Sequence, residues 1–251
     1  MSKPLTPWID AAALARPGVA HLLDYTLLKA EATQDDILRL CDDAAYAGIL
    51  AVCVNGGWVT TCVQRLGGTP VRVAAVVGFP LGAGSGAAKA AEAAVAVADG
   101  AVELDMVLPL GKVKAGDWTA VTEDVAVVSS AAPEALLKVI IESAILDASQ
   151  VAAACRSAVA GGARFVKTST GFHPAGGATV EAVRSMRAVV GPMIGVKASG
   201  GVRTAEQALA MIAAGANRIG LSSLEGLRDI VGSDKPPLGE LLGLTLSGMT
   251  G

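Results

Sequence analysis

Two lysines lie inside short apolar segments that have the composition of β-strands. Lys167 lies within FVKTST, residues 165–170, and Lys197 lies within IGVKASGG, residues 194–201. A buried ammonium group costs free energy unless an acid pairs with it or the protein uses it. Burial and a neighbouring positive charge both lower the pKa of a lysine, and the neutral amine is a nucleophile. The two segments therefore indicate chemistry that an amine carries out.

Three further charged residues occupy similar segments, namely Asp24, Asp105 and Lys138. A neutral lysine attacks a carbonyl to give a carbinolamine and then a Schiff base, whose iminium group makes the neighbouring C–H acidic. Asp105 is predicted to move that proton, either directly or through a water molecule. The predicted reaction makes or breaks a carbon–carbon bond through a Schiff base. The spacing does not choose between Lys167 and Lys197 as the nucleophile.

Each of these lysines, taken alone, has an ordinary structural explanation. Long lysine side chains reach solvent from strand ends or pair with an acid, and for a single lysine we weigh this equally with a catalytic role. Asp105, Lys138, Lys167 and Lys197, however, come from four consecutive strand-like segments. Such a cluster of charges on neighbouring strands favours a site.

The elements that must position these residues alternate along the chain. Short β-branched segments, the predicted strands, are residues 21–26, 49–55, 71–79, 101–108, 135–143, 163–170, 193–199 and 218–223. Ala-rich segments with helical spacing between them include residues 35–47, 87–98, 119–130, 148–159, 180–189 and 205–214. Strict alternation predicts parallel strands with helical crossovers, and eight such units predict a (β/α)8 TIM barrel. A doubly wound open sheet is the alternative.

The barrel is predicted to belong to a single domain that covers residues 1–251. The barrel proper is assigned to residues 20–231 and a C-terminal tail with one short helix to residues 232–251. A short N-terminal helix is predicted from Thr6 or Pro7 to Pro17–Gly18. Predicted N-caps are Thr33, Thr179 and Thr204, and predicted helix stops are Gly48, Gly100, Gly161 and Gly215.

Two loops near the end of the barrel have the composition of a phosphate site. ASGGVRT (residues 198–204) follows the seventh predicted strand, and GLSS (residues 220–223) ends the eighth. Phosphate groups commonly bind to these two loops of a TIM barrel, where backbone amides point at the anion. A single glycine is more often a turn or a helix cap, but the set favours phosphate. The predicted phosphate-binding residues are Gly171, Gly200, Gly201, Ser222 and Ser223.

Two other motifs carry less weight. GAGSGA, residues 82–87, fits a dinucleotide-binding pattern and has Glu103 or Asp105 about twenty residues further on. It follows the third predicted strand rather than the first, and Pro80 separates it from that strand, so we interpret it as a flexible loop. His21 and His173 are the only histidines, whereas a catalytic zinc site usually takes two or three. No metal and no other cofactor is expected.

Composition excludes several classes of protein. A net charge of -3 and an aromatic content of 3% argue against nucleic-acid binding. Apolar runs are too short for a membrane span, and the N-terminus lacks the pattern of a signal peptide. The cysteines form no CxxC pair, which predicts buried free thiols in a cytoplasmic protein: they are Cys41, Cys53, Cys62 and Cys155.

Nine motifs together resemble the deoxyribose-phosphate aldolase family, which are class I aldolases. They are LLDYTLLKAEAT, VVGFPLGA, ELDMV, GDW, KVIIES, FVKTSTGF, GGATVE, VKASGGVRT and RIGLSS, and they run from about Asp24 to Ser223. The resemblance implies reversible cleavage of 2-deoxy-D-ribose 5-phosphate to acetaldehyde and D-glyceraldehyde 3-phosphate, without a metal or organic cofactor. It implies small phosphosugar and aldehyde ligands as partners. A homodimer or a higher homo-oligomer is also expected.

The resemblance also implies a role for each charged residue. Lys167 forms the Schiff base, Lys197 lowers the pKa of Lys167, and Asp105 serves the proton relay. Asp24 and Lys138 complete the active-site network. The choice of Lys167 over Lys197 as nucleophile rests on the resemblance alone.

The chain departs from the family pattern in three places. Tyr25 stands where histidine is frequent, and Leu224 and Glu225 follow the two serines where glycine is usual. The second change predicts weaker phosphate affinity or a preference for a less charged aldehyde. Some members use a C-terminal tyrosine in proton transfer, whereas here Tyr25 and Tyr46 are the only tyrosines. Alternatives are another Schiff-base lyase or transaldolase-like enzyme, and a non-catalytic barrel that binds sugar phosphates.

Overall fold

The strands of the protein form one closed parallel barrel. The structure, a computed structural model, describes residues 8, 9 and 11–243. Each strand is hydrogen-bonded to the next, and β8 closes the ring against β1. The strands are β1 Leu23–Leu27, β2 Ala51–Val54, β3 Arg72–Val77, β4 Glu103–Val107, β5 Leu136–Ile140, β6 Phe165–Lys167, β7 Gly195–Ser199 and β8 Arg218–Leu221. This confirms the predicted TIM barrel and excludes the open sheet.

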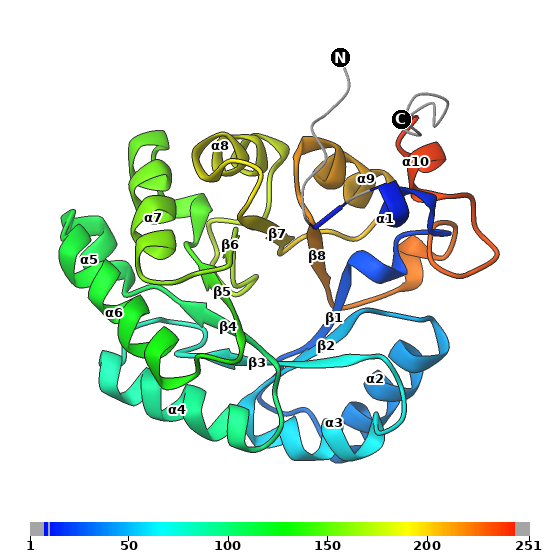
Figure 1. The fold of residues 1–251 in the computed structure, drawn as a ribbon, viewed down its shortest axis with the longest axis horizontal. Helices are drawn as coiled ribbons and strands as arrows, with labels where there is room; N and C mark the ends of the chain where they lie inside the picture. The colour runs from blue at the N-terminus through cyan, green and yellow to red at the C-terminus, as the bar shows by residue number, and fades with distance from the viewer. Residues whose placement is uncertain (1–7, 10, 244–251) are drawn as a thin grey trace.

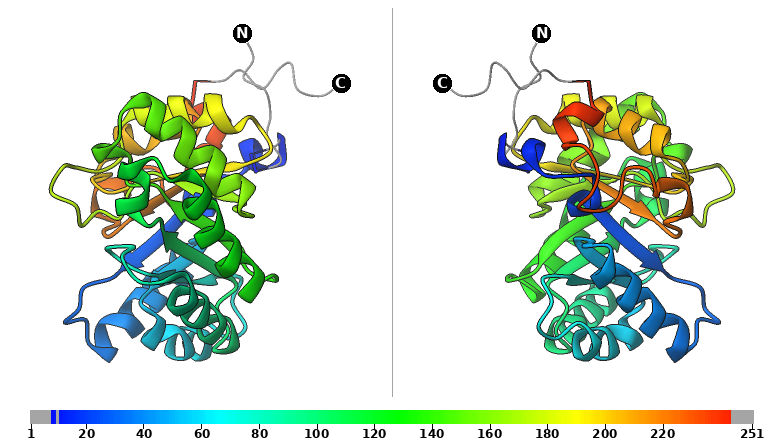
Figure 2. Two further views of the ribbon diagram at one scale, coloured as in Figure 1. Left: turned by 90° about the vertical axis from the view of Figure 1, so that its left-hand side faces the viewer. Right: turned by 90° about the vertical axis from the view of Figure 1, so that its right-hand side faces the viewer.

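Helices surround the barrel on its outside, as Figures 1 and 2 show. They are α2 Gln34–Tyr46, α3 Val59–Arg65, α4 Gly86–Ala98, α5 Leu110–Ala115, α6 Trp118–Ala131, α7 Ala148–Ala160, α8 Val180–Val190 and α9 Ala205–Ala214. Because the helices cover the outer face of the sheet and side chains fill its interior, both faces of each strand are buried. This explains why the strand sequences are almost continuously apolar.

Local signals fix the ends of several helices as predicted. The hydroxyls of Thr33, Thr179 and Thr204 accept hydrogen bonds from backbone amides in the first turns of α2, α8 and α9. Gly161 and Gly215 are the C-caps of α7 and α9. These caps satisfy backbone groups that a helix end leaves without partners.

Several elements differ from the sequence prediction. A 3-10 helix, Ala20–Leu22, delays the start of β1 to Leu23. β6 ends at Lys167 rather than at residue 170, because Thr168 and Thr170 turn their hydroxyls to Ser199 O and to the Glu142 carboxylate. The helices α3 and α5 were not predicted, since six or seven residues are too few to show a helical period.

The described parts of the two terminal regions lie side by side. Helix α1, Ala11–Ala15, packs beside α10, Leu238–Leu241, and Pro17 forms a β-bridge with Pro237 (Figures 1 and 2). The predicted short helix of the C-terminal tail is therefore present. The predicted start of the N-terminal helix at residues 6–7 and the tail beyond Gly243 lie outside the described residues.

Candidate active site

Strand pairing and barrel closure bring the predicted charged residues together inside the barrel. Asp105 is paired with Lys138 across β4 and β5, and Lys167 with Lys197 across β6 and β7. Asp24 lies on β1, which closes the ring next to β8. All five residues are at most 2% exposed. The structure thus collects every predicted catalytic residue in one buried cluster.

Asp105 is the centre of this cluster. Its Oδ1 accepts a hydrogen bond from Lys138 Nζ at 2.8 Å. Its Oδ2 accepts from Lys167 Nζ at 2.6 Å and from Lys197 Nζ at 2.7 Å. Three lysine amines therefore converge on one buried carboxylate.

A second group of charges lies toward the beginning of the strands and includes two residues without a predicted catalytic role, Glu103 and Arg218. Glu103 accepts hydrogen bonds from Arg218 at 3.1 and 3.2 Å and lies 2.6 Å from Lys138 Nζ. Arg218 also pairs with Asp24, which in turn pairs with Lys197. The available signal was the spacing of two between Glu103 and Asp105, which puts both side chains on the same face of a strand.

The charges in the cluster do not cancel if every group is ionised. The buried acids are Asp24, Glu103 and Asp105, and the buried bases are Lys138, Lys167, Lys197 and Arg218. One positive charge is then in excess, and the half-exposed Arg72, which reaches Glu103 at 3.1 Å, adds to this excess. Because an unpaired buried charge is costly, the cluster favours the neutral form of one lysine.

The pKa directions single out Lys167 as that lysine. Burial lowers the pKa of Lys167, Asp105 opposes this effect, and the positive charge of Lys197 adds to the lowering. Burial also acts on Lys138 and Lys197, but their carboxylate neighbours outweigh it and raise both pKa values. Lys167 is therefore the amine most readily available as a nucleophile.

The carboxylates stay ionised despite their burial. Burial alone would raise the pKa of Asp105, but the three lysines hold it well below its usual range. For Asp24, burial is likewise outweighed by Arg218, Lys197 and Lys138, so its pKa is also low. Both groups therefore remain acceptors for the cations that surround them.

An apolar wall borders the cluster on the side of β2 and β3. Cys53 Sγ lies 3.9 Å from Asp105 Oδ2, and burial raises the pKa of this thiol to about 11. Leu28, Ala74 and Val76 pack with Cys53, and the half-buried Phe79 packs against them. Such a wall limits the access of water to the lysines, which keeps the burial effect on Lys167 strong.

The predicted phosphate loops meet at a close contact between glycines. Gly171 and Gly200 have φ values of 81° and 85°, and a Cβ on Gly200 would lie 3.2 Å from Gly171 Cα. A Cβ on Gly177 would lie 2.1 Å from Gly200 O, so only glycine fits there. Gly177 was not among the predicted phosphate residues. Gly201, with φ 84°, continues this loop.

The two predicted serines follow β8 and are exposed. Ser223 Oγ accepts a hydrogen bond from the amide of Glu225 at 3.2 Å. The half-buried Leu224 packs against the hydrophobic core, and a 3-10 helix begins at Glu225. Leu224 thus anchors the loop rather than filling the space beside the serines.

The remaining motifs have structural surroundings of their own. Tyr25 is half-buried and packs with the core outside the barrel interior. Burial raises the pKa of its hydroxyl, and the negative charge of Asp43 adds to this effect. Gly82 lies where a Cβ would be 1.9 Å from Leu108 O, and Ser85 caps α4. Among the described residues, no group of three His, Cys, Asp or Glu side chains is placed to hold a metal ion.

Removing one member of the buried Glu103–Arg218 pair should destabilise the fold. We expect Glu103→Gln to cost about 3–5 kcal/mol of unfolding free energy, because Arg218 and Lys138 lose a buried counter-charge. Urea unfolding measures the loss. Glu134→Gln is the matched control, since Glu134 is exposed and should change stability by less than about 0.5 kcal/mol. Equal stability of the two variants would contradict the prediction.

Within the described residues, no helix is long and apolar enough to cross a membrane.

Comparisons with known proteins point to aldolases. The model of the family described as DeoC/LacD family aldolase matches residues 19–230. The deoxyribose-phosphate aldolases of Brevibacillus brevis and Mycobacterium tuberculosis are each 52% identical to the chain. The match covers 80% of this chain and 90% of the Brevibacillus protein, and 85% and 96%, respectively, for the Mycobacterium protein.

Solved structures give the same result. An aldolase named QR15 is 38% identical with a TM-score of 0.79, and the match covers 83% of this chain and 93% of QR15. A tetrameric deoxyribose phosphate aldolase from Aeropyrum pernix is 31% identical with a TM-score of 0.74, covering 83% of this chain and 88% of that protein.

Proposed function

The chain belongs to the DeoC/LacD family of aldolases, and from that premise we propose that it is a deoxyribose-phosphate aldolase with Lys167 as the Schiff-base residue. The substrate is 2-deoxy-D-ribose 5-phosphate, and the products are acetaldehyde and D-glyceraldehyde 3-phosphate. The observation that carries the residue assignment is the convergence of three lysine amines on Asp105 at 2.6–2.8 Å. The lowered pKa of Lys167 supports its choice among the three.

The proposed reaction begins when the neutral Lys167 amine attacks C1 of the open-chain sugar. Loss of water from the carbinolamine gives an iminium ion, which withdraws electrons from the C2–C3 bond. Removal of the proton from the C3 hydroxyl then lets this bond break. D-glyceraldehyde 3-phosphate leaves, and the two remaining carbons stay on Lys167 as an enamine. Protonation at C2 and hydrolysis release acetaldehyde.

Asp105 is proposed to organise the proton transfers. Its low pKa makes it an acceptor that does not hold a proton for long, which suits a relay through a water molecule. Lys197 and Lys138 keep it ionised, and Asp24 places Lys197 through their ion pair. The Schiff base supplies the electron sink, so this chemistry requires neither a metal nor an organic cofactor.

The glycine and serine loops are proposed to hold the phosphate. Gly171, Gly200 and Gly201 provide backbone that an anion can approach closely, and Ser222 and Ser223 add amides and hydroxyls. A phosphate anchored there would orient the sugar so that its aldehyde lies at the lysines. Binding energy from this remote group is then available to position C1.

Acetaldehyde release from 2-deoxy-D-ribose 5-phosphate tests the proposed function. The purified protein should release acetaldehyde and D-glyceraldehyde 3-phosphate in equal amounts. A transaldolase-like enzyme would instead transfer a larger ketose fragment, which a substrate panel detects. A non-catalytic barrel would bind the sugar phosphate without releasing acetaldehyde.

Lys197→Leu should move the pH profile of the reaction upward. The substitution removes a positive charge beside Lys167 and frees Asp105 to pair with it, so the pKa of Lys167 rises. A higher pKa means that the neutral amine forms only at higher pH. We expect the acidic limb of the kcat/KM profile to shift up by about one to three pH units.

The exposed Lys112 provides the control for this measurement. Lys112→Leu removes the same charge at the surface and should leave the profile in place. An unchanged profile for Lys197→Leu would refute the role of Lys197 in lowering the pKa of Lys167.

We also propose that the enzyme is a single-domain, cytoplasmic homo-oligomer. The four cysteines are buried and free, as expected in a reducing compartment. The tetrameric relative from Aeropyrum pernix supports assembly into an oligomer.

A further inference from the structure

The five residues proposed to bind the phosphate supply hydrogen-bond donors but no positive charge, and the first loop also carries the exposed Arg203. The five residues are glycines and serines, and the Ser223 hydroxyl already accepts a hydrogen bond from the Glu225 amide. The exposed Glu225 adds a negative charge at the end of the same loop. A phosphate dianion is most strongly held by charge-assisted hydrogen bonds to lysine or arginine. The counter-charge must therefore come from Arg203 or from a cation beside the serines.

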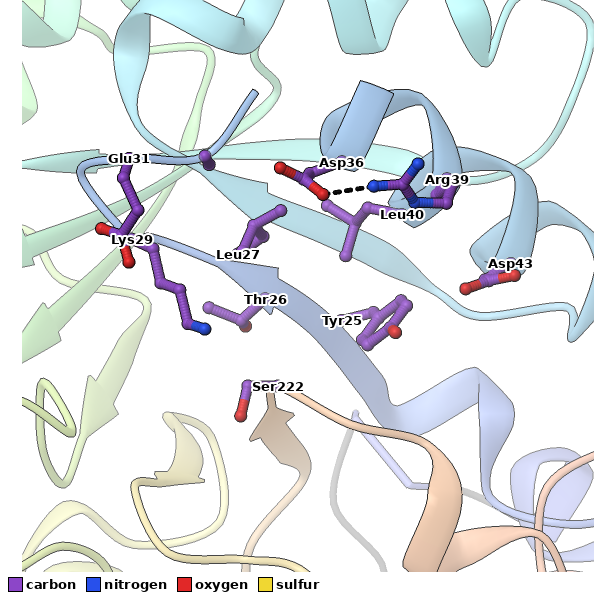
Figure 3. Close-up of a pocket in the computed structure, with 11 residues that line it drawn as sticks. Tyr25, Thr26, Leu27, Lys29, Glu31, Asp36, Arg39, Leu40, Asp43 and Ser222 are labelled. Carbon is purple, nitrogen blue, oxygen red and sulfur yellow. Dashed lines mark hydrogen bonds and ion pairs between the residues drawn. The ribbon is translucent and has the colours of Figure 1, made fainter. Parts of the chain in front are cut away.

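A pocket beside Ser222 contains such residues. It has a volume of about 330 Å³, and Ser222 forms one side of it, while residues of β1, the loop after β1 and α2 form the rest (Figure 3). The strand register explains this arrangement. Tyr25 of β1 is paired with Leu221 of β8, so Thr26 and Ser222 follow side by side at the carboxyl ends of these strands.

Lys29 is the cation of this pocket that is free to bind an anion. It follows β1 by two residues, is exposed, and forms no ion pair within the described part of the chain. Figure 3 shows its amine turned toward Thr26 and Ser222. The other cation of the pocket, Arg39, is held by the Asp36 carboxylate.

Of the acids that line the pocket, only Glu31 opposes the positive charge of Lys29 at the end near Ser222. Asp36 is engaged by Arg39 and by the Thr33 hydroxyl, which donates to it at 2.6 Å. Asp43 lies at the far end of the pocket, beyond Tyr25 (Figure 3). Glu31 is exposed on the same loop as Lys29 and opposes its charge without pairing with it. Lys29 and Glu31 should therefore affect anion binding in opposite directions.

We propose that Lys29 pairs with the phosphate of the substrate and thereby determines the preference for phosphorylated over unphosphorylated sugars. The proposal rests on the proposed aldolase function and deepens it. A lysine suits this position because its charge sits on a flexible stem that can follow the phosphate as the substrate enters. Arg203 belongs to the first phosphate loop, but it does not line the pocket that Lys29 shares with Ser222.

The test compares kcat/KM for 2-deoxy-D-ribose 5-phosphate and for 2-deoxy-D-ribose. Lys29→Gln should lower the value for the phosphorylated sugar by about 10- to 100-fold, mainly through KM. The value for the unphosphorylated sugar should stay unchanged, so the preference collapses. Glu31→Gln should instead lower KM for the phosphorylated sugar. The effect of Lys29→Gln should weaken at high salt, which screens exposed charges.

Arg39→Gln is the matched control, because it removes the same charge from the same pocket. It should leave the preference within about twofold of the wild type, since Arg39 belongs to an exposed salt bridge. The proposal is overturned if Lys29→Gln weakens both substrates equally, or if Arg39→Gln or Arg203→Gln removes the preference while Lys29→Gln does not.

A binding measurement separates this proposal from the proposed function. Calorimetric titration of the wild type and of Lys29→Gln with inorganic phosphate needs no turnover. Weaker phosphate binding to Lys29→Gln supports the proposal even if the wild type does not cleave 2-deoxy-D-ribose 5-phosphate. Equal binding to both proteins overturns the role of Lys29 and leaves the aldolase function to be judged by acetaldehyde release.

Discussion

Lys167→Met should lose aldolase activity by at least about 10⁴-fold, because removal of a covalent nucleophile leaves only binding and positioning. Methionine keeps the length of the side chain without an amine, so it should still fit the buried site. The loss should appear in kcat/KM for 2-deoxy-D-ribose 5-phosphate at every pH at which the wild type is active. Activity near that of the wild type would end the Schiff-base proposal.

Trapping the intermediate identifies the nucleophile independently of activity. Borohydride added with acetaldehyde should reduce the imine and leave one ethyl group on Lys167, which peptide mass spectrometry locates. The other lysines of the same sample serve as controls. Lys89 is 1% exposed and binds Asp124 and Val107 O, so it tests whether burial alone causes labelling. An ethyl group on Lys197 instead of Lys167 would reverse their proposed roles.

Asp105→Asn should reduce kcat by about 10²- to 10⁴-fold, the usual contribution of a group that moves protons. It should also destabilise the fold, because Lys138, Lys167 and Lys197 lose their common carboxylate. Breaking buried pairs of this kind costs about 3–5 kcal/mol.

The stability of Asp105→Asn should rise with pH. Without this carboxylate, Lys167 loses the acid that opposes the burial effect, so its pKa falls further below that of a lysine in the unfolded chain. At a pH between the pKa of Lys167 in the folded protein and its pKa in the unfolded chain, the unfolded state binds more protons than the folded state. The free energy of unfolding therefore increases as the pH rises through this range. Urea midpoints at about pH 6 and about pH 9 measure the slope. Asp43→Asn, an exposed aspartate, should follow the wild type; the same slope in both variants would contradict the prediction.

Much of this site could be predicted because, in a barrel, the position of a residue along its strand determines where its side chain lies. Asp105, Lys167 and Lys197 each lie within an otherwise apolar strand, and period-two alternation together with eight repeated units places them inside one ring. What alternation could not supply was the difference between the lysines. That difference depends on which carboxylate each amine reaches, and therefore on side-chain distances.

Glu103 and Arg218 show what escaped prediction. Each begins its strand, where a charged side chain normally meets solvent, and Glu103 was considered only as a ribose-binding acid. Closure of the barrel places β8 beside β1, and this long-range pairing buries Arg218 against Asp24 and Glu103. No local pattern contains that contact. The shared pocket of Lys29 and Ser222 arises from the same closure.

The shared counter-ions of the cluster have a consequence for directed evolution. The three buried acids Asp24, Glu103 and Asp105 share ion pairs with four buried cations. A substitution at one position therefore changes the charge environment of all the others. Residues that share partners in this way show large non-additive effects. Strong epistasis should therefore govern the cluster, and single-site libraries will undervalue substitutions that are tolerated only in charge-matched pairs. Variants with altered aldehyde preference are better sought at the apolar wall and in the loop after β1, where side chains can change one at a time.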